Sequence, residues 1–90
     1  MSKIIQDVNL GVNLRKLRKA KGLTQEQVCA QMGLAGRPMS QSSYAQIETG
    51  ARNIYASDLI VVVRVLGATF EDVFRDLKPI NKYDLEGNLT

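Results

Sequence analysis

The sequence has no histidine and only one cysteine, Cys29. A single cysteine cannot form an internal disulfide, and without histidine a zinc site is not expected. Histidine is also the side chain that most often transfers protons near neutral pH, so its absence argues against acid–base catalysis. The chain has no glycine-rich phosphate loop and no nucleophile beside an evident base. We therefore expect neither an enzyme nor a protein that binds a metal or cofactor, and we interpret Cys29 as a buried structural thiol.

Long apolar segments are absent as well. The apolar run from Leu59 to Val63, LIVVV, is too short to span a bilayer, and no apolar run precedes a cleavage site in the first thirty residues. A cytoplasmic protein without membrane contact is expected. Ninety residues leave room for one domain, which we place at residues 1–77, followed by a polar C-terminal arm at 78–90.

Basic residues are concentrated in the first part of the chain. Residues 1–55 hold eight Lys and Arg against three Asp and Glu, a net charge of +5. Residues 56–90 hold four against six, a net charge of −2. This asymmetry indicates that the first half faces phosphate while the second faces elsewhere, although an ordinary solvated surface would give the same composition.

Helix signals follow one another between residues 10 and 48. The first helix has an apolar stripe at helical spacing and stops at Gly22; the stripe consists of Leu10, Leu14 and Leu17. Thr24 followed by Gln27 is a capping-box pattern, so the second helix begins at Thr24 and buries Val28 and Met32. Breaking residues from Gly33 to Pro38 then predict a loop of about seven residues.

A third helix is expected from Ser40, which is a good N-cap. At helical spacing Tyr44 and Ile47 share an apolar face, and the opposite face carries Gln41, Ser42, Ala45 and Gln46. Amide side chains pair with base edges, hydroxyls serve bases or phosphates, and alanine fits against a thymine methyl. Because this face has none of the Lys and Glu that a solvated face usually carries, we favour base reading over simple solvent exposure.

Three blocks of sequence resemble the phage-repressor and Cro type of helix-turn-helix domain, the XRE family, over residues 10–74. They are LGVNLRKLRKAKGLTQEQV, YAQIETGARN and VLGATFEDVF, arranged around G-L-T-Q and I-E-x-G. The resemblance implies an all-α, compact five-helix, lambda-repressor-like bundle. It also implies a transcriptional regulator, most often a repressor, that binds double-stranded operator DNA as a homodimer on a palindromic site. An antitoxin, a transcriptional bridging factor and a controller protein of a restriction-modification system remain alternatives on the same fold.

The family's functional positions fall on particular residues of this chain. The resemblance places base reading at Gln41, Ser42 and Gln46, and phosphate contacts at Gln25 and Arg52. It also implies an ion pair between Arg18 and Glu48 that joins the first helix to the end of the third.

Two departures from the family stand out. Glu48 follows Gly33 by fifteen positions, five more than usual, and the extension contains Ala35, Gly36, Arg37, Pro38 and Met39. Arg37 is either a further phosphate contact or a residue that keeps the loop soluble. Ile54 and Tyr55 stand where proline and a small capping residue are common, which leaves the start of the fourth helix open.

The fourth helix is apolar nearly all round. Leu59, Val62, Val63 and Leu66 gather toward the core, whereas Val61 and Val65 fall on the far side. A helix at the surface normally has one polar, solvent-exposed face, so we expect another apolar surface to pack over these two valines. The candidates are a second subunit, Ile4 and Ile5, or the tail with Ile80, Tyr83, Leu85 and Leu89. We expect the dimer interface at Val61 and Val65, away from the basic surface. A fifth helix then closes the core with Phe70, Val73, Phe74 and Leu77.

Overall fold

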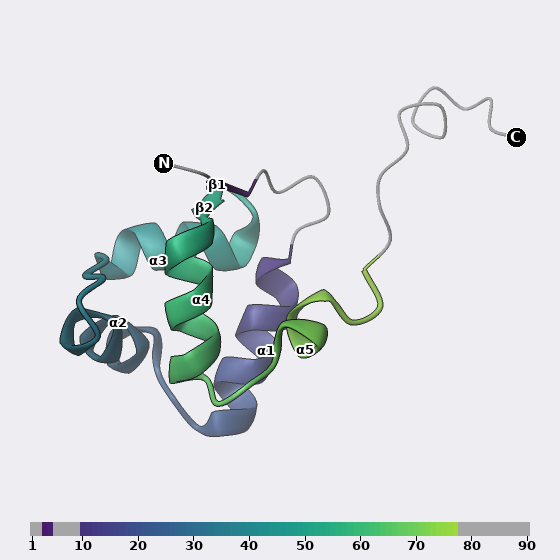
Figure 1. Cartoon of the computed structure of the whole chain (residues 1–90), viewed down its shortest axis with the longest axis horizontal. Coiled ribbons are helices and arrows are strands. Elements are labelled where there is room, and N and C mark those ends of the chain that lie inside the picture. The colour runs from purple at the N-terminus through teal and green to yellow at the C-terminus, as the bar shows by residue number, and fades with distance from the viewer. Residues whose placement is uncertain (1–2, 5–9, 78–90) are drawn as a thin grey trace, which may run out of the picture.

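Five helices surround one apolar core in the computed structural model, which describes residues 3–4 and 10–77. The helices are α1 (Gly11–Lys21), α2 (Gln25–Leu34), α3 (Gln41–Thr49), α4 (Ala56–Val65) and α5 (Phe70–Phe74). Figure 1 shows α4 in front of the bundle, with α1 and α5 on one side and α2 and α3 on the other. The predicted five-helix architecture, with α2 and α3 as the helix-turn-helix, is confirmed.

The helix ends follow the predicted caps. The Thr24 hydroxyl accepts from the Gln27 backbone N–H at 3.1 Å, and the Gln27 side chain accepts from the Thr24 N–H at 2.8 Å. Ser40 caps α3 by accepting from the Ser43 N–H at 3.1 Å. One prediction was wrong, because α2 continues through Gly33 to Leu34. Gly33 has no positive φ, and the first left-handed backbone position after α2 is Gly36.

The core draws on every helix. Its fully or nearly fully buried members are Leu10, Leu14, Val28, Met32, Tyr44, Ile47, Ile54, Leu59, Val62, Val63, Leu66 and Val73. The expected contribution of α5 needs correction. Phe70 and Phe74 are 47% and 43% exposed, and only Val73 is buried. α5 has only five residues, and Phe70 and Phe74, four positions apart, lie on the same face of it beside the buried Val73.

Helix α1 packs closely on the end of α3. Gly11, in the first turn of α1, lies so near α3 that a Cβ atom there would overlap the carbonyl oxygen of Ile47 and the backbone of Glu48. Only glycine permits this approach. The contact fixes how far apart the two helices lie.

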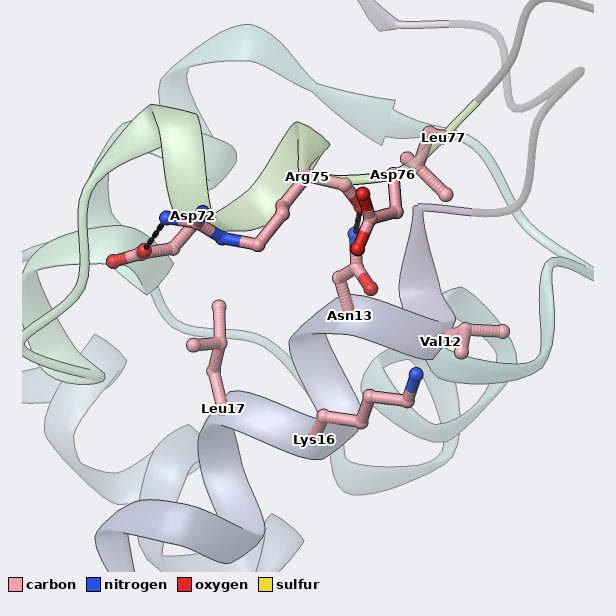
Figure 2. A pocket seen from close by; sticks show the side chains of 8 residues that line it. All are labelled: Val12, Asn13, Lys16, Leu17, Asp72, Arg75, Asp76 and Leu77. Atoms are coloured by element: carbon pink, nitrogen blue, oxygen red, sulfur yellow. Dashed lines mark hydrogen bonds and ion pairs between the residues drawn. The ribbon is translucent and has the colours of Figure 1, made fainter.

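The other side of α1 holds α5 in place. The side-chain amide of Asn13 donates to the carbonyl oxygens of Val73 and Arg75, at 2.7 and 2.9 Å. A hollow of about 410 Å³ lies at this junction, between α1 on one side and α5 with the residues that follow it on the other. Figure 2 shows the side chains that line it. Asp76, at its edge, has a φ of 62°, a left-handed conformation that aspartate tolerates better than most residues. Asn13 thereby ties down the backbone where α5 ends.

A short strand pair was not expected from the sequence. β1 (Lys3–Ile4) pairs antiparallel with β2 (Ile54–Tyr55), with Ile4 opposite Ile54 and Lys3 opposite Tyr55. β2 leads directly into α4, whose N-cap is Tyr55 without a side-chain cap. This pairing accounts for the departure at Ile54 and Tyr55, because a proline at either position would lack the N–H that a ladder can use. The predicted arm at 78–90, Ile5 and the tail residues offered as a cover all lie outside the described residues.

Candidate nucleic-acid interface

The outer face of α3 is polar and open to solvent. Gln41, Ser42 and Gln46 are exposed and Ala45 is half-buried, whereas Tyr44 and Ile47 on the opposite face are buried. The structure therefore brings the four predicted base-reading residues onto one accessible helix face. No acidic residue lies on this face, because Glu48, the only acidic residue of α3, is 4% exposed and turned inward.

Glu48 forms a buried, two-pronged ion pair with Arg18. Arg18 Nε donates to Glu48 Oε2 at 2.7 Å and Arg18 Nη2 donates to Glu48 Oε1 at 3.1 Å. Arg18 Nη1 also donates to the Leu23 carbonyl at 2.8 Å, and the Gln25 side chain donates to Glu48 Oε1 at 3.1 Å. The network joins α1, the start of α2 and the end of α3. It holds α3 against the bundle so that its polar face points outward.

The charges of this pair stabilise each other. Burial opposes ionisation of Glu48, but hydrogen bonds from Arg18 and Gln25 outweigh it and hold the pKa of Glu48 below that of an ordinary carboxyl group. The hydrogen bond to Glu48 raises the pKa of Arg18. Burial, followed by the neighbouring Glu48 carboxylate, raises the pKa of Tyr44, so its hydroxyl stays neutral. The pair is ionised at neutral pH.

A basic groove runs between α1 and α3. It encloses about 660 Å³, and its wall on α1 carries Arg15, Lys16 and Lys19, all exposed. Ala45 and Thr49 form the wall on α3, and the Arg18–Glu48 pair lies at its base. The lysines of α1 thus lie beside the polar face of α3. The sequence alone does not show what these cations face, because that depends on how α1 packs on α3.

Two of the residues predicted to contact DNA are hydrogen-bonded to each other. Arg52, in the turn after α3, donates from Nε to Gln46 Oε1 at 3.0 Å. The sequence assigned Gln46 to a base and Arg52 to a phosphate, with nothing to show that the two side chains meet. Gln25, the other residue assigned to phosphate, is half-buried and its amide donates to Glu48.

The extended turn is anchored to α4. Arg37 Nε donates to Asp58 Oδ1 at 2.8 Å, and Asp58 lies in the first turn of α4 with only 8% of its surface exposed. The arginine offered as a phosphate contact therefore has a partner inside the protein. The signal in the sequence was one acidic residue in the first turn of α4, which alone does not indicate which cation it meets.

The valines assigned to dimerisation need a partial correction. Val61 and Val65 are half-buried and pack against the core, so they are not on a bare outer face. α4 contacts α2 along the bundle and contacts β1 and β2 near its N-terminal end (Figure 1). The apolar residue that α4 exposes is Ile60, at 41%.

A reactive thiol, a metal site and a membrane span would each leave distinct features in the described part of the chain. Burial raises the pKa of the half-buried Cys29 thiol, which disfavours the reactive thiolate. Residues 3–4 and 10–77 contain no group of three His, Cys, Asp or Glu side chains placed to hold a metal ion. No described helix has both the length and the apolar character needed to cross a membrane.

Comparison with known proteins identifies the family. The sequence pattern of the helix-turn-helix domain family matches residues 9–77, which is most of the chain. The chain belongs to the helix-turn-helix family. A relative of this family, control protein C.MunI from a Mycoplasma species, is 35% identical over 72 residues, which cover 79% of this chain and 90% of the relative.

Solved structures of this helix-turn-helix type share the fold. The restriction-modification controller protein C.AhdI from Aeromonas hydrophila is 30% identical, with a TM-score of 0.64 over 74% of this chain and 94% of that one. The clp gene regulator ClgR from C. glutamicum is 25% identical, with a TM-score of 0.66 over 79% of this chain and 85% of that one. The expected class, a helix-turn-helix DNA-binding regulator, is confirmed by these relatives.

Proposed function

We propose that this protein is a sequence-specific regulator of transcription, of the restriction-modification controller kind, rather than an enzyme. The observation that carries the proposal is the α3 face, where exposed amide and hydroxyl side chains stand free of acidic neighbours. The matches cover 90% of C.MunI and 94% of C.AhdI, and this favours a controller over a general repressor.

In the proposed complex α3 enters the major groove of DNA. Gln41, Ser42 and Gln46 read base edges, and Ala45 lies against an apolar base group. The basic groove beside α3 receives the flanking phosphate backbone, because Arg15, Lys16 and Lys19 lie along one wall of it. The Arg18–Glu48 pair does not touch DNA in this scheme. It positions α3 relative to the cations of α1.

Selection of binding sites from random duplexes, followed by affinity measurements on the selected site, tests this scheme. Gln41→Ala should weaken binding to the selected site by about 1 to 3 kcal/mol and to random DNA only slightly, because alanine cannot bond to a base edge. Gln31→Ala, an exposed glutamine on α2, is the matched control and should leave both affinities unchanged. Equal losses on selected and random DNA would remove Gln41 as a base reader. Failure to select any sequence would refute the proposal.

Phosphate contacts have a different signature. Lys16→Gln or Lys19→Gln should weaken binding to all sequences alike and reduce the slope of log affinity against log salt by about one unit each. Lys21→Gln is the control, because Lys21 is exposed at the end of α1 but does not line the basic groove. An unchanged slope in both groove variants would separate the groove from DNA.

The regulator is proposed to act as a homodimer through the outer side of α4. A twofold dimer would present two copies of α3 about one turn of DNA apart, roughly 34 Å, on a palindromic operator. The partial burial of Val61 and Val65 makes Ile60 the better residue to test. Ile60→Glu should give a folded monomer in sedimentation equilibrium, with weaker binding to the palindrome. Leu34→Glu, at a residue 83% exposed on α2, should leave the dimer intact. A wild-type monomer at high micromolar concentration would refute this assignment.

A further inference from the structure

The side-chain amide of Gln46 has a fixed orientation. Its hydrogen-bond partner is the Nε–H of Arg52, and a guanidinium only donates, so the atom that faces it must be the amide oxygen. The nitrogen, Nε2, is therefore the end that points away from Arg52. It donates no hydrogen bond to any residue in the described part of the chain, and the side chain is exposed.

The backbone holds Gln46 and Arg52 together. The carbonyl oxygen of Gln46 accepts from the N–H groups of Ala51 and Arg52, at 2.8 and 3.2 Å, and from the Thr49 hydroxyl at 3.0 Å. Gly50, with a φ of 83°, ends α3 and folds the chain back over its last turn. Arg52 is thus returned to the side of Gln46 by the turn itself. The contact between their side chains is built before any ligand arrives.

This orientation bears on which base Gln46 reads. A bidentate contact with adenine uses the amide oxygen as acceptor from N6 and the nitrogen as donor to N7. In this protein the amide oxygen is turned toward Arg52 and one of its two lone pairs accepts from Nε–H, whereas both hydrogens of Nε2 are available for acceptors. Guanine presents two adjacent acceptors, N7 and O6, and no donor on its major-groove edge.

We infer that the Gln46–Arg52 pair makes Gln46 a reader of guanine, with Arg52 as the positioning residue that holds the amide oxygen and so favours guanine over adenine. The inference rests on the proposed function, because it assigns a base to one residue of the proposed α3 interface. Arg52 acts on Gln46 through its Nε–H.

Selection from random duplexes is carried out with the wild type, Gln46→Ala and Arg52→Met. The base pair read by Gln46 is the one whose preference disappears in Gln46→Ala. The wild type should prefer G·C over A·T there by about fivefold or more. In Arg52→Met the amide oxygen of Gln46 no longer accepts from a guanidinium, so Gln46 can again bind adenine through both its oxygen and its nitrogen. The base-pair preference at this position should therefore move toward A·T. Arg64→Met, at an exposed arginine of α4, is the control and should keep the wild-type preference.

Affinities for paired duplexes that differ only at that base pair are compared at one salt concentration, so the contribution of Arg52 to phosphate binding cancels from the ratio. An A·T preference in the wild type, or a G·C preference kept in Arg52→Met, would overturn the inference. If no base pair loses its preference in Gln46→Ala, Gln46 reads no base and the inference is also overturned. These outcomes leave the proposed function standing. That proposal fails only if no sequence is selected at all.

Discussion

The Arg18–Glu48 pair allows the sharpest test of how this fold is held together. The perturbations are Glu48→Gln, Arg18→Met and the double variant. In Glu48→Gln the guanidinium of Arg18 stays in a site where its side chain is only 10% exposed, and it keeps its bond to the Leu23 carbonyl. In Arg18→Met the carboxylate, with a side chain 2% exposed, keeps the donor from Gln25 but has no cation beside it.

Each single variant strands a buried charge, so each should lower the free energy of unfolding by about 3 to 5 kcal/mol. The double variant leaves neither charge, and its loss should be smaller than the sum of the two. A coupling energy of about 1 to 3 kcal/mol is expected for side chains in direct contact. A domain of this size has about 5 to 15 kcal/mol in total, so the single variants approach the limit of folding.

Urea denaturation followed by circular dichroism gives the four free energies of the cycle. The matched control is the pair of Asp72 and Arg75, which also form an ion pair, at 3.0 Å, but lie at the surface three residues apart. Asp72→Asn with Arg75→Met should show little coupling, because water and salt screen exposed charges. A coupling below about 0.5 kcal/mol at Arg18 and Glu48 would refute the reasoning. A single variant that fails to fold while the double variant folds would support it.

Three further outcomes follow from the same contacts. Gly11→Ala should lower the free energy of unfolding, measured by urea denaturation, by about 1 to 3 kcal/mol, because α1 must move away from α3. Gly33→Ala, at a helical position with open space around it, should raise the free energy of unfolding by about 1 kcal/mol. Equal effects of the two variants would contradict the close approach of α1 to α3. The pKa of Glu48 is lowered in the folded protein, so the ionised carboxylate stabilises the fold fully above its ordinary pKa of 4.5, and this stabilisation is lost as the pH falls through the pKa of the folded state. Glu48→Gln should therefore flatten the acid side of a curve of unfolding free energy against pH. An unchanged acid side would contradict this. Arg37→Met should speed hydrogen exchange in the extended turn and at the start of α4, because Asp58 is left buried without its ion-pair partner, and unchanged exchange there would contradict the anchor.

Local signals predicted the helices well. The capping box at Thr24 and the cap at Ser40 depend on residues three positions apart, and such short-range hydrogen bonds can be inferred from sequence alone. The burial of Tyr44 and Ile47 followed from helical spacing. The accessible face of α3 could therefore be outlined before the fold was known.

Contacts between distant segments were harder to foresee. The bond from Arg37 to Asp58 and the pairing of β1 with β2 join positions far apart in the chain, and no local pattern marks which residues will meet. The exposure of Phe70 had the same origin, since it depends on the length and placement of α5 rather than on hydrophobicity. The Gln46–Arg52 contact was missed for a different reason. The resemblance to the family assigns each of these two side chains to DNA separately, and it does not show that they bond to each other.

The anchored turn has a practical consequence for engineering this protein. The orientation of α3 is set at its far end, where Gly11 and the Arg18–Glu48 pair hold it to α1, and the loop ahead of it is fastened separately to α4. The length of the loop is therefore uncoupled from the direction in which α3 points. Gly36, exposed and with open space around it, is a suitable position for a fluorophore-bearing insert that would report on the approach of a ligand without displacing the helix that meets it.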